Sequence, residues 1–151
     1  MNILLVEDNP GDIHLAREAL KDGVPMPYCL DVVTDGDAAI KMLLREEGYE
    51  AARTPDIIFL DLNIPKRSGT EVLELIKQHQ ELKLIPVIIF STSESQSDIE
   101  QCYRLQANCY VSKPLDYDDF VRVIKAVISF WTQVATMPKS SWTNQHINQV
   151  A

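Results

Sequence analysis

Residues 3–10 read Ile3-Leu4-Leu5-Val6-Glu7-Asp8-Asn9-Pro10, an apolar run that ends in two acids and a proline. Four consecutive apolar residues predict a strand that is buried on both faces, as in a parallel sheet. Asn9 and Pro10 have the character of an N-cap and a first-turn proline, so a helix should begin directly after the acids. The stretch therefore predicts a strand, an acidic turn and a helix in direct succession.

The same order of elements recurs along the chain. Further apolar runs predict strands at 30–33, 57–60, 86–90 and 109–111, with helical periodicity between them and an amphipathic helix after Asp116. Alternating strands and helices predict a parallel sheet with helices on both faces and right-handed crossovers. The expected fold class is thus α/β, a doubly wound (βα)5 sandwich. The connection at 46–55 is longer than such links usually are.

Length and charge limit what the chain can be. It has 151 residues, and 14 Lys+Arg against 22 Asp+Glu give a net charge of −8. This length corresponds to a single domain, which we expect at 1–130, with 131–151 as a helix end and tail and no output domain. The negative charge argues against nucleic acid as a partner. Without a basic leader or an apolar run of roughly 20 residues, we expect a cytoplasmic protein with no membrane partner.

Polar residues follow four of the five expected strands. Glu7 and Asp8 come after the first strand, Asp61 after the third, Ser91 after the fourth and Lys113 after the fifth. Each of them alone could be a turn or cap residue. The carboxyl ends of parallel strands, however, meet at one rim of the sheet, where doubly wound folds bind ligands. The joint placement therefore predicts one site.

The expected site has a defined chemistry. Three clustered carboxylates repel one another unless a cation neutralises them, and oxygen ligands with room for water suit Mg²⁺. Lys113 and Ser91 could bind the oxygens of an incoming phosphoryl group, and an aspartate can itself accept it. Asp61 is the best candidate for the acceptor because it leaves the central strand alone. Glu7 and Asp8 form a pair that is better suited to holding metal.

These residues together resemble a known family, the receiver domain of two-component response regulators. The motifs that carry the resemblance are Leu4-Leu5-Val6-Glu7-Asp8-Asn9, Asp61-Leu62-Asn63-Ile64-Pro65 with Gly69, Ser91-Thr92-Ser93 and Tyr110-Val111-Ser112-Lys113-Pro114. The resemblance covers roughly residues 1–130 and implies a flavodoxin-like sheet in the order 2-1-3-4-5.

The resemblance also implies roles for individual residues. Asp61 would be the phosphoacceptor; Asp8, Asp61 and the backbone carbonyl of Asn63 would bind Mg²⁺, with Glu7 acting through water. The remaining implied roles are phosphate binding and switching by Ser91, Thr92, Lys113 and Tyr110, a cis peptide at Pro114, and tuning of dephosphorylation by Asn63 and Ser93.

A narrower resemblance concerns partners. The motif at 6–12, the stretch 63–66 and the end of the last helix are similar to stand-alone receivers that partner phytochrome-type histidine kinases. Homodimers are common in that subgroup. Phe130 and Trp131 are therefore candidate dimer contacts, and the alternative is that they pack on the protein's own core.

The expected function is that of a single-domain response regulator that accepts a phosphoryl group from a histidine kinase on Asp61 and switches a protein-interaction surface. Apart from self-catalysed phosphorylation and dephosphorylation of this aspartate, we expect no enzymatic activity. The open alternative is a relay intermediate that passes its phosphate to a His phosphotransfer protein. A small-molecule phosphatase is disfavoured because Asn63 stands where a general acid is needed. A flavin-binding module is disfavoured because Glu7 and Asp8 would repel its phosphate. The complete set of acids, hydroxyl and lysine argues against an adaptor that does not depend on phosphorylation.

Overall fold

The computed structural model describes residues 1–138, whose five parallel strands form one sheet in the order β2-β1-β3-β4-β5. The strands are β1 (Asn2–Val6), β2 (Cys29–Val33), β3 (Ile57–Leu60), β4 (Val87–Ser91) and β5 (Cys109–Ser112). The helices are α1 (Pro10–Gly23), α2 (Gly36–Leu44), α3 (Gly69–Gln78), α4 (Gln96–Arg104) and α5 (Tyr117–Ser129). The predicted fold class and strand order are confirmed.

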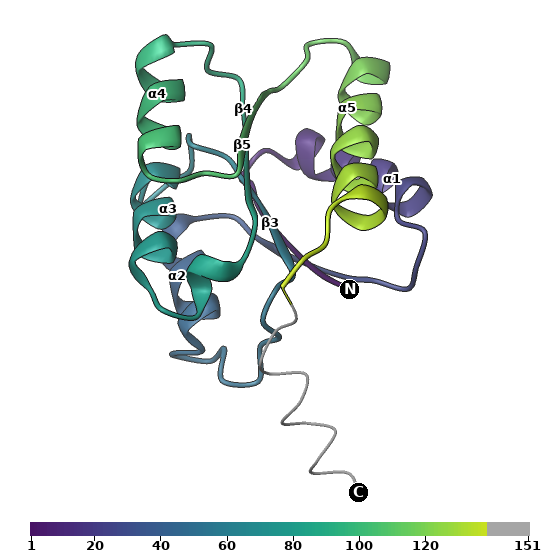
Figure 1. Cartoon of the computed structure of the whole chain (residues 1–151). Coiled ribbons are helices and arrows are strands. Elements are labelled where there is room, and N and C mark those ends of the chain that lie inside the picture. Colours follow the sequence, from purple (N-terminus) through teal and green to yellow (C-terminus); the bar gives the residue numbers. More distant parts are fainter. Residues whose placement is uncertain (139–151) are drawn as a thin grey trace, which may run out of the picture.

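Helices cover both faces of the sheet. α1 and α5 lie on one face, and α2, α3 and α4 lie on the other (Figure 1). Side chains alternate along each strand, so Leu4 and Val6 belong to the core cluster under α2 and α3. Ile3 and Leu5 belong to the cluster under α1 and α5. Both faces of β1 are therefore buried, as its apolar run predicts. Within residues 1–138, no helix combines the length and the apolar character that a membrane span requires.

Each of the five α-helices begins at a polar cap, whose side chain accepts a hydrogen bond from the backbone N–H three residues on. The caps are Asn9, Asp35, Ser68, Ser95 and Asp116. Such caps satisfy N–H groups that a helix start leaves without partners. They let each helix begin close to the strand before it, which keeps the rim compact.

A 3₁₀ turn before β4 and the π-helical form of the end of the last helix were not predicted. A 3₁₀ turn, η1, spans Leu82–Leu84, and α5 continues beyond Ser129 as a π-helical turn, η2, over Phe130–Val134. The Thr132 hydroxyl donates to the Ile128 carbonyl at 2.7 Å. In a regular α-helix this carbonyl would accept from the Thr132 N–H, so the hydroxyl competes with the α-helical bond.

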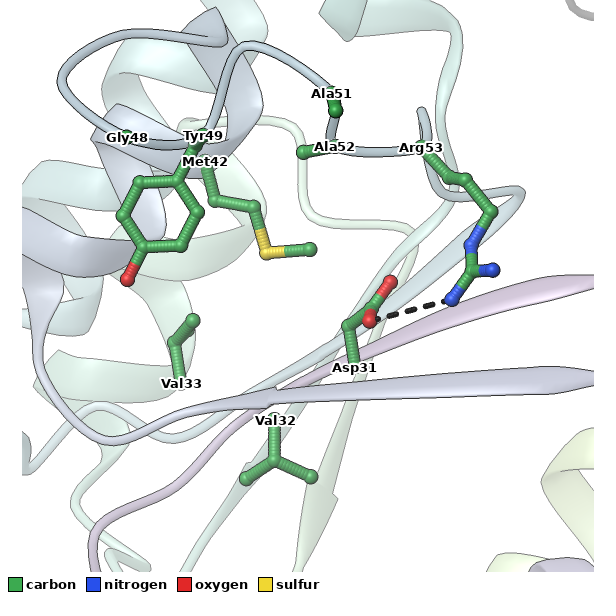
Figure 2. Close-up of a pocket in the computed structure, with 9 residues that line it drawn as sticks. All are labelled: Asp31, Val32, Val33, Met42, Gly48, Tyr49, Ala51, Ala52 and Arg53. Carbon is green, nitrogen blue, oxygen red and sulfur yellow. Dashed lines mark hydrogen bonds and ion pairs between the residues drawn. The ribbon is translucent and has the colours of Figure 1, made fainter.

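The long connection between α2 and β3 folds back beside β2, the edge strand. Tyr49 and Ala52 pack against the core from this connection, and Arg53 lies 3.5 Å from Asp31 of β2. Together with Met42 they line a cavity of about 430 Å³, shown in Figure 2. No residue of the predicted site lines this cavity.

Candidate functional site

The predicted site residues lie at the carboxyl rim of the sheet. Glu7 and Asp8 follow β1, Asp61 follows β3, Ser91 ends β4 and Lys113 comes directly after β5. Of the polar and charged residues in the described part of the chain, those that are buried are Glu7, Asp61, Ser91 and Lys113. Burying a polar or charged group is costly unless it is paired. The buried charged groups Glu7, Asp61 and Lys113 are therefore expected to be paired with one another.

Lys113 lies at the centre of the site. Its Nζ atom is 2.5 Å from Oε2 of Glu7, 2.8 Å from Oδ2 of Asp61 and 2.9 Å from Oδ2 of Asp12. The side chain of Lys113 is only 4% exposed. An ammonium group has three N–H donors, so each of them has a carboxylate partner. These bonds hold the charge of Lys113 beside Asp61.

Three carboxylates form a group that is suited to a cation. Oxygen atoms of Glu7, Asp8 and Asp61 all lie within 4.8 Å of one another. Glu7 and Asp61 are buried, whereas Asp8 is exposed. A hard cation such as Mg²⁺ prefers oxygen ligands and retains several waters. The donor set and its one open side therefore fit a divalent cation of this kind.

The buried groups perturb one another's protonation. Burial raises the pKa of Glu7 to about 7, and the nearby charge of Asp61 adds to this, while Lys113 and the Asn9 N–H act in the opposite direction. Burial would lower the pKa of Lys113, but its bonds to Asp61, Glu7 and Asp12 outweigh this and raise it above its ordinary value. Lys113 therefore stays positively charged at neutral pH, and Glu7 is able to change its charge there.

The backbone around Asp61 leaves no spare room. The Asn63 N–H donates to Oδ1 of Asp61 at 3.2 Å, and the Asp61 N–H donates to the Val6 carbonyl at 3.1 Å. A Cβ atom at Gly69 would lie 2.2 Å from the Asp61 carbonyl oxygen. Such a contact is far inside van der Waals distance, so α3 can start this close to Asp61 only with glycine at 69.

A chain of hydrogen bonds runs from Ser91 to α4. The Ser93 N–H donates to Oγ of Ser91 at 3.3 Å, and the Tyr110 hydroxyl donates to the Ser93 carbonyl at 2.8 Å. The Ser93 hydroxyl donates to Oδ2 of Asp98 at 2.5 Å. Ser91 is fully buried, whereas Thr92 is exposed. Because Lys113 N–H also donates to the Ser91 carbonyl at 2.8 Å, this chain joins the site directly.

Asp12 is a site residue that was not predicted from the sequence. It lies in the first turn of α1, where an acid is normally explained by its favourable interaction with the helix dipole. The available signal was its place three residues after the N-cap Asn9, because the first turn of a helix that directly follows β1 lies close to the carboxyl rim of the sheet. Only the fold shows that Lys113 meets Asp12 there.

The expectation of a cis peptide at Pro114 is wrong in this structure. No peptide bond among residues 1–138 is cis, so the bond between Lys113 and Pro114 is trans. The two isomers of a bond to proline differ intrinsically by only about 0.5–1 kcal/mol. The residue types alone therefore do not decide between them.

Phe130 and Trp131 lie outside the site. Trp131 is half-buried, packs against the cluster under α1 and α5, and lines a cavity of about 480 Å³ with Met1, which precedes β1. It is therefore near the opposite end of the strands from Asp61. Phe130 is 49% exposed and meets Trp131 edge-on, with the ring centroids 5.5 Å apart. The structure thus separates the two aromatic residues into one that faces the core and one that faces outwards.

The fold and the site define a doubly wound α/β protein that has three carboxylates and a buried lysine at the carboxyl rim of its sheet. Residues 3–125 match the family model described as the response regulator receiver domain. The chain belongs to the response regulator receiver family.

Similar proteins come from the same family. The response regulator Rcp1 of Synechocystis is 40% identical over 136 residues, which is 90% of this chain and 92% of Rcp1. The crystal structure of Mn²⁺-bound Rcp1 has a TM-score of 0.88 at 39% identity, covering 91% of this chain and 99% of the other. The phosphorylated cyanobacterial phytochrome response regulator RcpA has a TM-score of 0.89 at 42% identity, covering 91% and 98%.

Proposed function

We propose that this protein accepts a phosphoryl group on Asp61 in two-component signalling. The observation that carries this proposal is the pairing of buried Asp61 with buried Lys113 at 2.8 Å, beside two further acids that suit a divalent cation. Asp61 offers a carboxylate oxygen as the nucleophile, and Lys113 offers a fixed positive charge for the oxygens of the phosphoryl group. The phosphorylated relative RcpA supports the same chemistry.

Phosphoryl transfer to Asp61 forms one bond to phosphorus and breaks another. A carboxylate oxygen of Asp61 forms a bond to phosphorus while the P–N bond of a phosphohistidine breaks. The electron pair of that bond remains on the imidazole nitrogen. Lys113 would neutralise the oxygens of the phosphoryl group during this step, and Ser91 would donate a hydrogen bond to one of them.

Mg²⁺ would be held by Asp8, Asp61 and the backbone carbonyl of Asn63, with Glu7 acting through a water. When bound, the ion supplies positive charge against the phosphoryl oxygens. The exposed Asp8 and the buried pair Glu7 and Asp61 are the oxygen donors that suit this role. Rcp1, which is similar over most of its length, has been crystallised with Mn²⁺.

The signal would leave through the chain of hydrogen bonds that starts at Ser91. A phosphoryl group on Asp61 that draws the Ser91 hydroxyl towards it competes with the bond from the Ser93 N–H. Ser93 in turn forms hydrogen bonds with Tyr110 of β5 and with Asp98 of α4. Phosphorylation would in this way change the surface formed by α4 and β5. Asn63, whose N–H donates to Oδ1 of Asp61, and Ser93 would set how fast the phosphate is lost. Thr92 would bind the phosphate from the rim.

The partner that delivers phosphate would be a sensor histidine kinase, as for receiver domains in general. The similarity to the phytochrome response regulator RcpA favours a kinase of the phytochrome type. Residues 1–130 would act as the receiver in a homodimer to which the exposed Phe130 contributes. We regard the chain as a protein that modifies itself and then signals, not as an enzyme that turns over a separate substrate.

The direct test is to incubate the protein with phosphoramidate and Mg²⁺ and to measure its intact mass. We expect one phosphoryl group on the wild type, located on Asp61 by peptide mapping, and none on Asp61→Asn. A matched control is Asp22→Asn, because Asp22 is an exposed acid of α1 whose ion pair with Lys125 lies outside the site.

The outcomes separate the alternatives. A folded wild type that stays unmodified in the presence of Mg²⁺ contradicts the proposal. Steady release of phosphate from small phosphate esters would instead point to a phosphatase. Labelling of Asp61→Asn at the wild-type rate would show that another residue is the acceptor.

A further inference from the structure

Asp12 is the third carboxylate on Lys113, and it differs from the other two. Its side chain is 25% exposed, whereas those of Glu7 and Asp61 are 3% and 7% exposed. It comes from a helix and not from the end of a strand. It also stands outside the group of acids whose oxygens could share a cation, which consists of Glu7, Asp8 and Asp61.

The position of Asp12 is determined by the start of α1. Oδ1 of Asn9 accepts a hydrogen bond from the Asp12 N–H at 3.1 Å, and Pro10 is the first residue of the helix. A side-chain cap together with a first-turn proline restricts the backbone of this turn. The carboxylate of Asp12 therefore reaches Nζ of Lys113 from a rigid support, across 101 residues of sequence.

The three partners of Lys113 would not all persist during phosphoryl transfer. A cation held by Asp61 and, through a water, by Glu7 competes with Lys113 for their oxygens, and the phosphoryl group is added to Asp61 itself. Asp12 takes part in neither event. It is therefore the one partner that can hold an ammonium proton of Lys113 throughout, while the remaining donors turn to the phosphoryl oxygens.

We propose that Asp12 is a positioning residue for phosphoryl transfer. It holds Nζ of Lys113 beside Asp61 while the cation and the phosphoryl group engage the carboxylates of Glu7 and Asp61. The proposal rests on the proposed function, since it concerns the same transfer. Asp12 itself touches neither the phosphoryl group nor the acceptor oxygen, and acts through Lys113. Loss of orientation at a reacting centre typically costs one to two orders of magnitude in rate.

The test compares Asp12→Asn, Asp12→Ser and Asp12→Glu with the wild type. The rate of phosphorylation by phosphoramidate with saturating Mg²⁺ should fall roughly tenfold in Asp12→Asn and Asp12→Ser. Asp12→Glu retains the charge and should recover most of the rate. Asp37→Asn is the control, because Asp37 is also a first-turn acid, in α2. It forms an ion pair of 3.2 Å with Arg67 and does not contact Lys113. It should phosphorylate at the wild-type rate.

A second readout reports on Lys113 directly. The NMR signal of its side-chain ammonium group should be sharp in the wild type, because all three donors are bonded in a buried site. In Asp12→Asn this signal should shift and broaden through faster proton exchange, and in Asp12→Glu it should recover. A merely structural role of Asp12 in α1 would lower stability without this effect, so stability to urea is measured alongside.

The two proposals fail in different ways. If the wild type accepts no phosphoryl group, the proposed function is wrong and the role of Asp12 falls with it. If the wild type is phosphorylated and Asp12→Asn reacts as fast or faster, only the role of Asp12 is overturned. A slow variant whose Lys113 signal is unchanged also overturns it, because Asp12 then acts by another route. If Asp12→Asn does not fold, Asp12→Ser provides the same test of the role of Asp12, because serine is well tolerated near the start of a helix.

Discussion

The Nζ atom of Lys113 lies 2.8 Å from Oδ2 of Asp61, and both side chains are buried although 52 residues separate them. This pair brings the end of the last strand to the end of the central one. Isolated buried charges are prohibitively costly, so each of these groups depends on the other and on the acids around them.

Replacing Lys113 should destabilise the metal-free protein strongly. Lys113→Met leaves the carboxylates of Glu7 and Asp61 buried without their cation, and breaking a buried pair in this way costs about 3–5 kcal/mol. Urea unfolding in the presence of a chelator measures the loss. Lys125→Met is the control, because Lys125 forms an exposed pair with Asp22 at 3.7 Å; it should change stability by less than about 1 kcal/mol. Equal effects of the two substitutions would contradict the burial argument.

The stability of the metal-free protein should depend on pH through Glu7. The pKa of Glu7 is raised from 4.5 to about 7 in the folded protein. A raised pKa means that the folded state binds the proton more tightly, so this contribution is complete below pH 4.5 and is lost as pH rises through about 7. The size of this contribution is at most about 3–4 kcal/mol, since each pKa unit corresponds to about 1.4 kcal/mol.

Urea titrations from pH 4.5 to 8 test the role of Glu7. The fall in the free energy of unfolding should be smaller in Glu7→Gln than in the wild type, because glutamine does not ionise. Saturating Mg²⁺ should remove most of the difference by stabilising the ionised carboxylate. The same pH profile in both proteins would show that Glu7 does not titrate in this range.

The link between Ser93 and Asp98 should appear as a coupling between the two side chains. Their hydrogen bond measures 2.5 Å and joins the loop after β4 to α4. A double-mutant cycle of Ser93→Ala and Asp98→Asn should give a coupling of about 0.5–3 kcal/mol in unfolding free energy. Gln96 and Glu100, which meet on the exposed face of α4 at 3.3 Å, supply a control cycle that should give less. Additive effects at Ser93 and Asp98 would contradict the link.

Gly69→Ala should disturb the acceptor without touching its side chain. The new Cβ would lie 2.2 Å from the Asp61 carbonyl oxygen and 2.7 Å from Cα of Leu62. Because both obstacles are backbone atoms, they cannot move aside as a flexible side chain could. We expect a loss of about 2 kcal/mol or more in unfolding free energy and slower phosphorylation. Thr70→Ala, one position further into α3, should leave both nearly unchanged; if Gly69→Ala behaves like it, the close approach is not important.

Phe130 and Trp131 should respond differently to truncation. Trp131→Ala removes a ring that packs on the cluster under α1 and α5, and should cost about 2–4 kcal/mol. Phe130→Ala removes a half-exposed ring and should cost less than about 1 kcal/mol in the monomer. Sedimentation at several concentrations then tests self-association, which Phe130→Ala should weaken if the ring faces a second copy. Unchanged association would remove Phe130 from the dimer contacts.

Much of the fold could be predicted from local patterns. The apolar runs at β1 and β3 are uninterrupted because both faces of these strands are buried, and the caps at Asn9 and Asp116 act within one turn of their helices. Such features depend on neighbours in the sequence, so the residue types reveal them directly. The convergence of Glu7, Asp61, Ser91 and Lys113 was also predictable, because parallel strands bring their carboxyl ends to one rim.

The sequence by itself therefore determined the alternation of elements, the sheet class and the set of residues at the rim. Only the tertiary structure decided that Lys113 takes Asp12 as its third partner. It also decided that the peptide bond to Pro114 is trans, and that Trp131 packs on the core while Phe130 faces outwards. The physical reason is the distance along the chain over which each kind of interaction acts. Periodicity and capping act within a few residues, whereas contacts across 101 residues depend on distances of a few ångströms that the whole packed core sets.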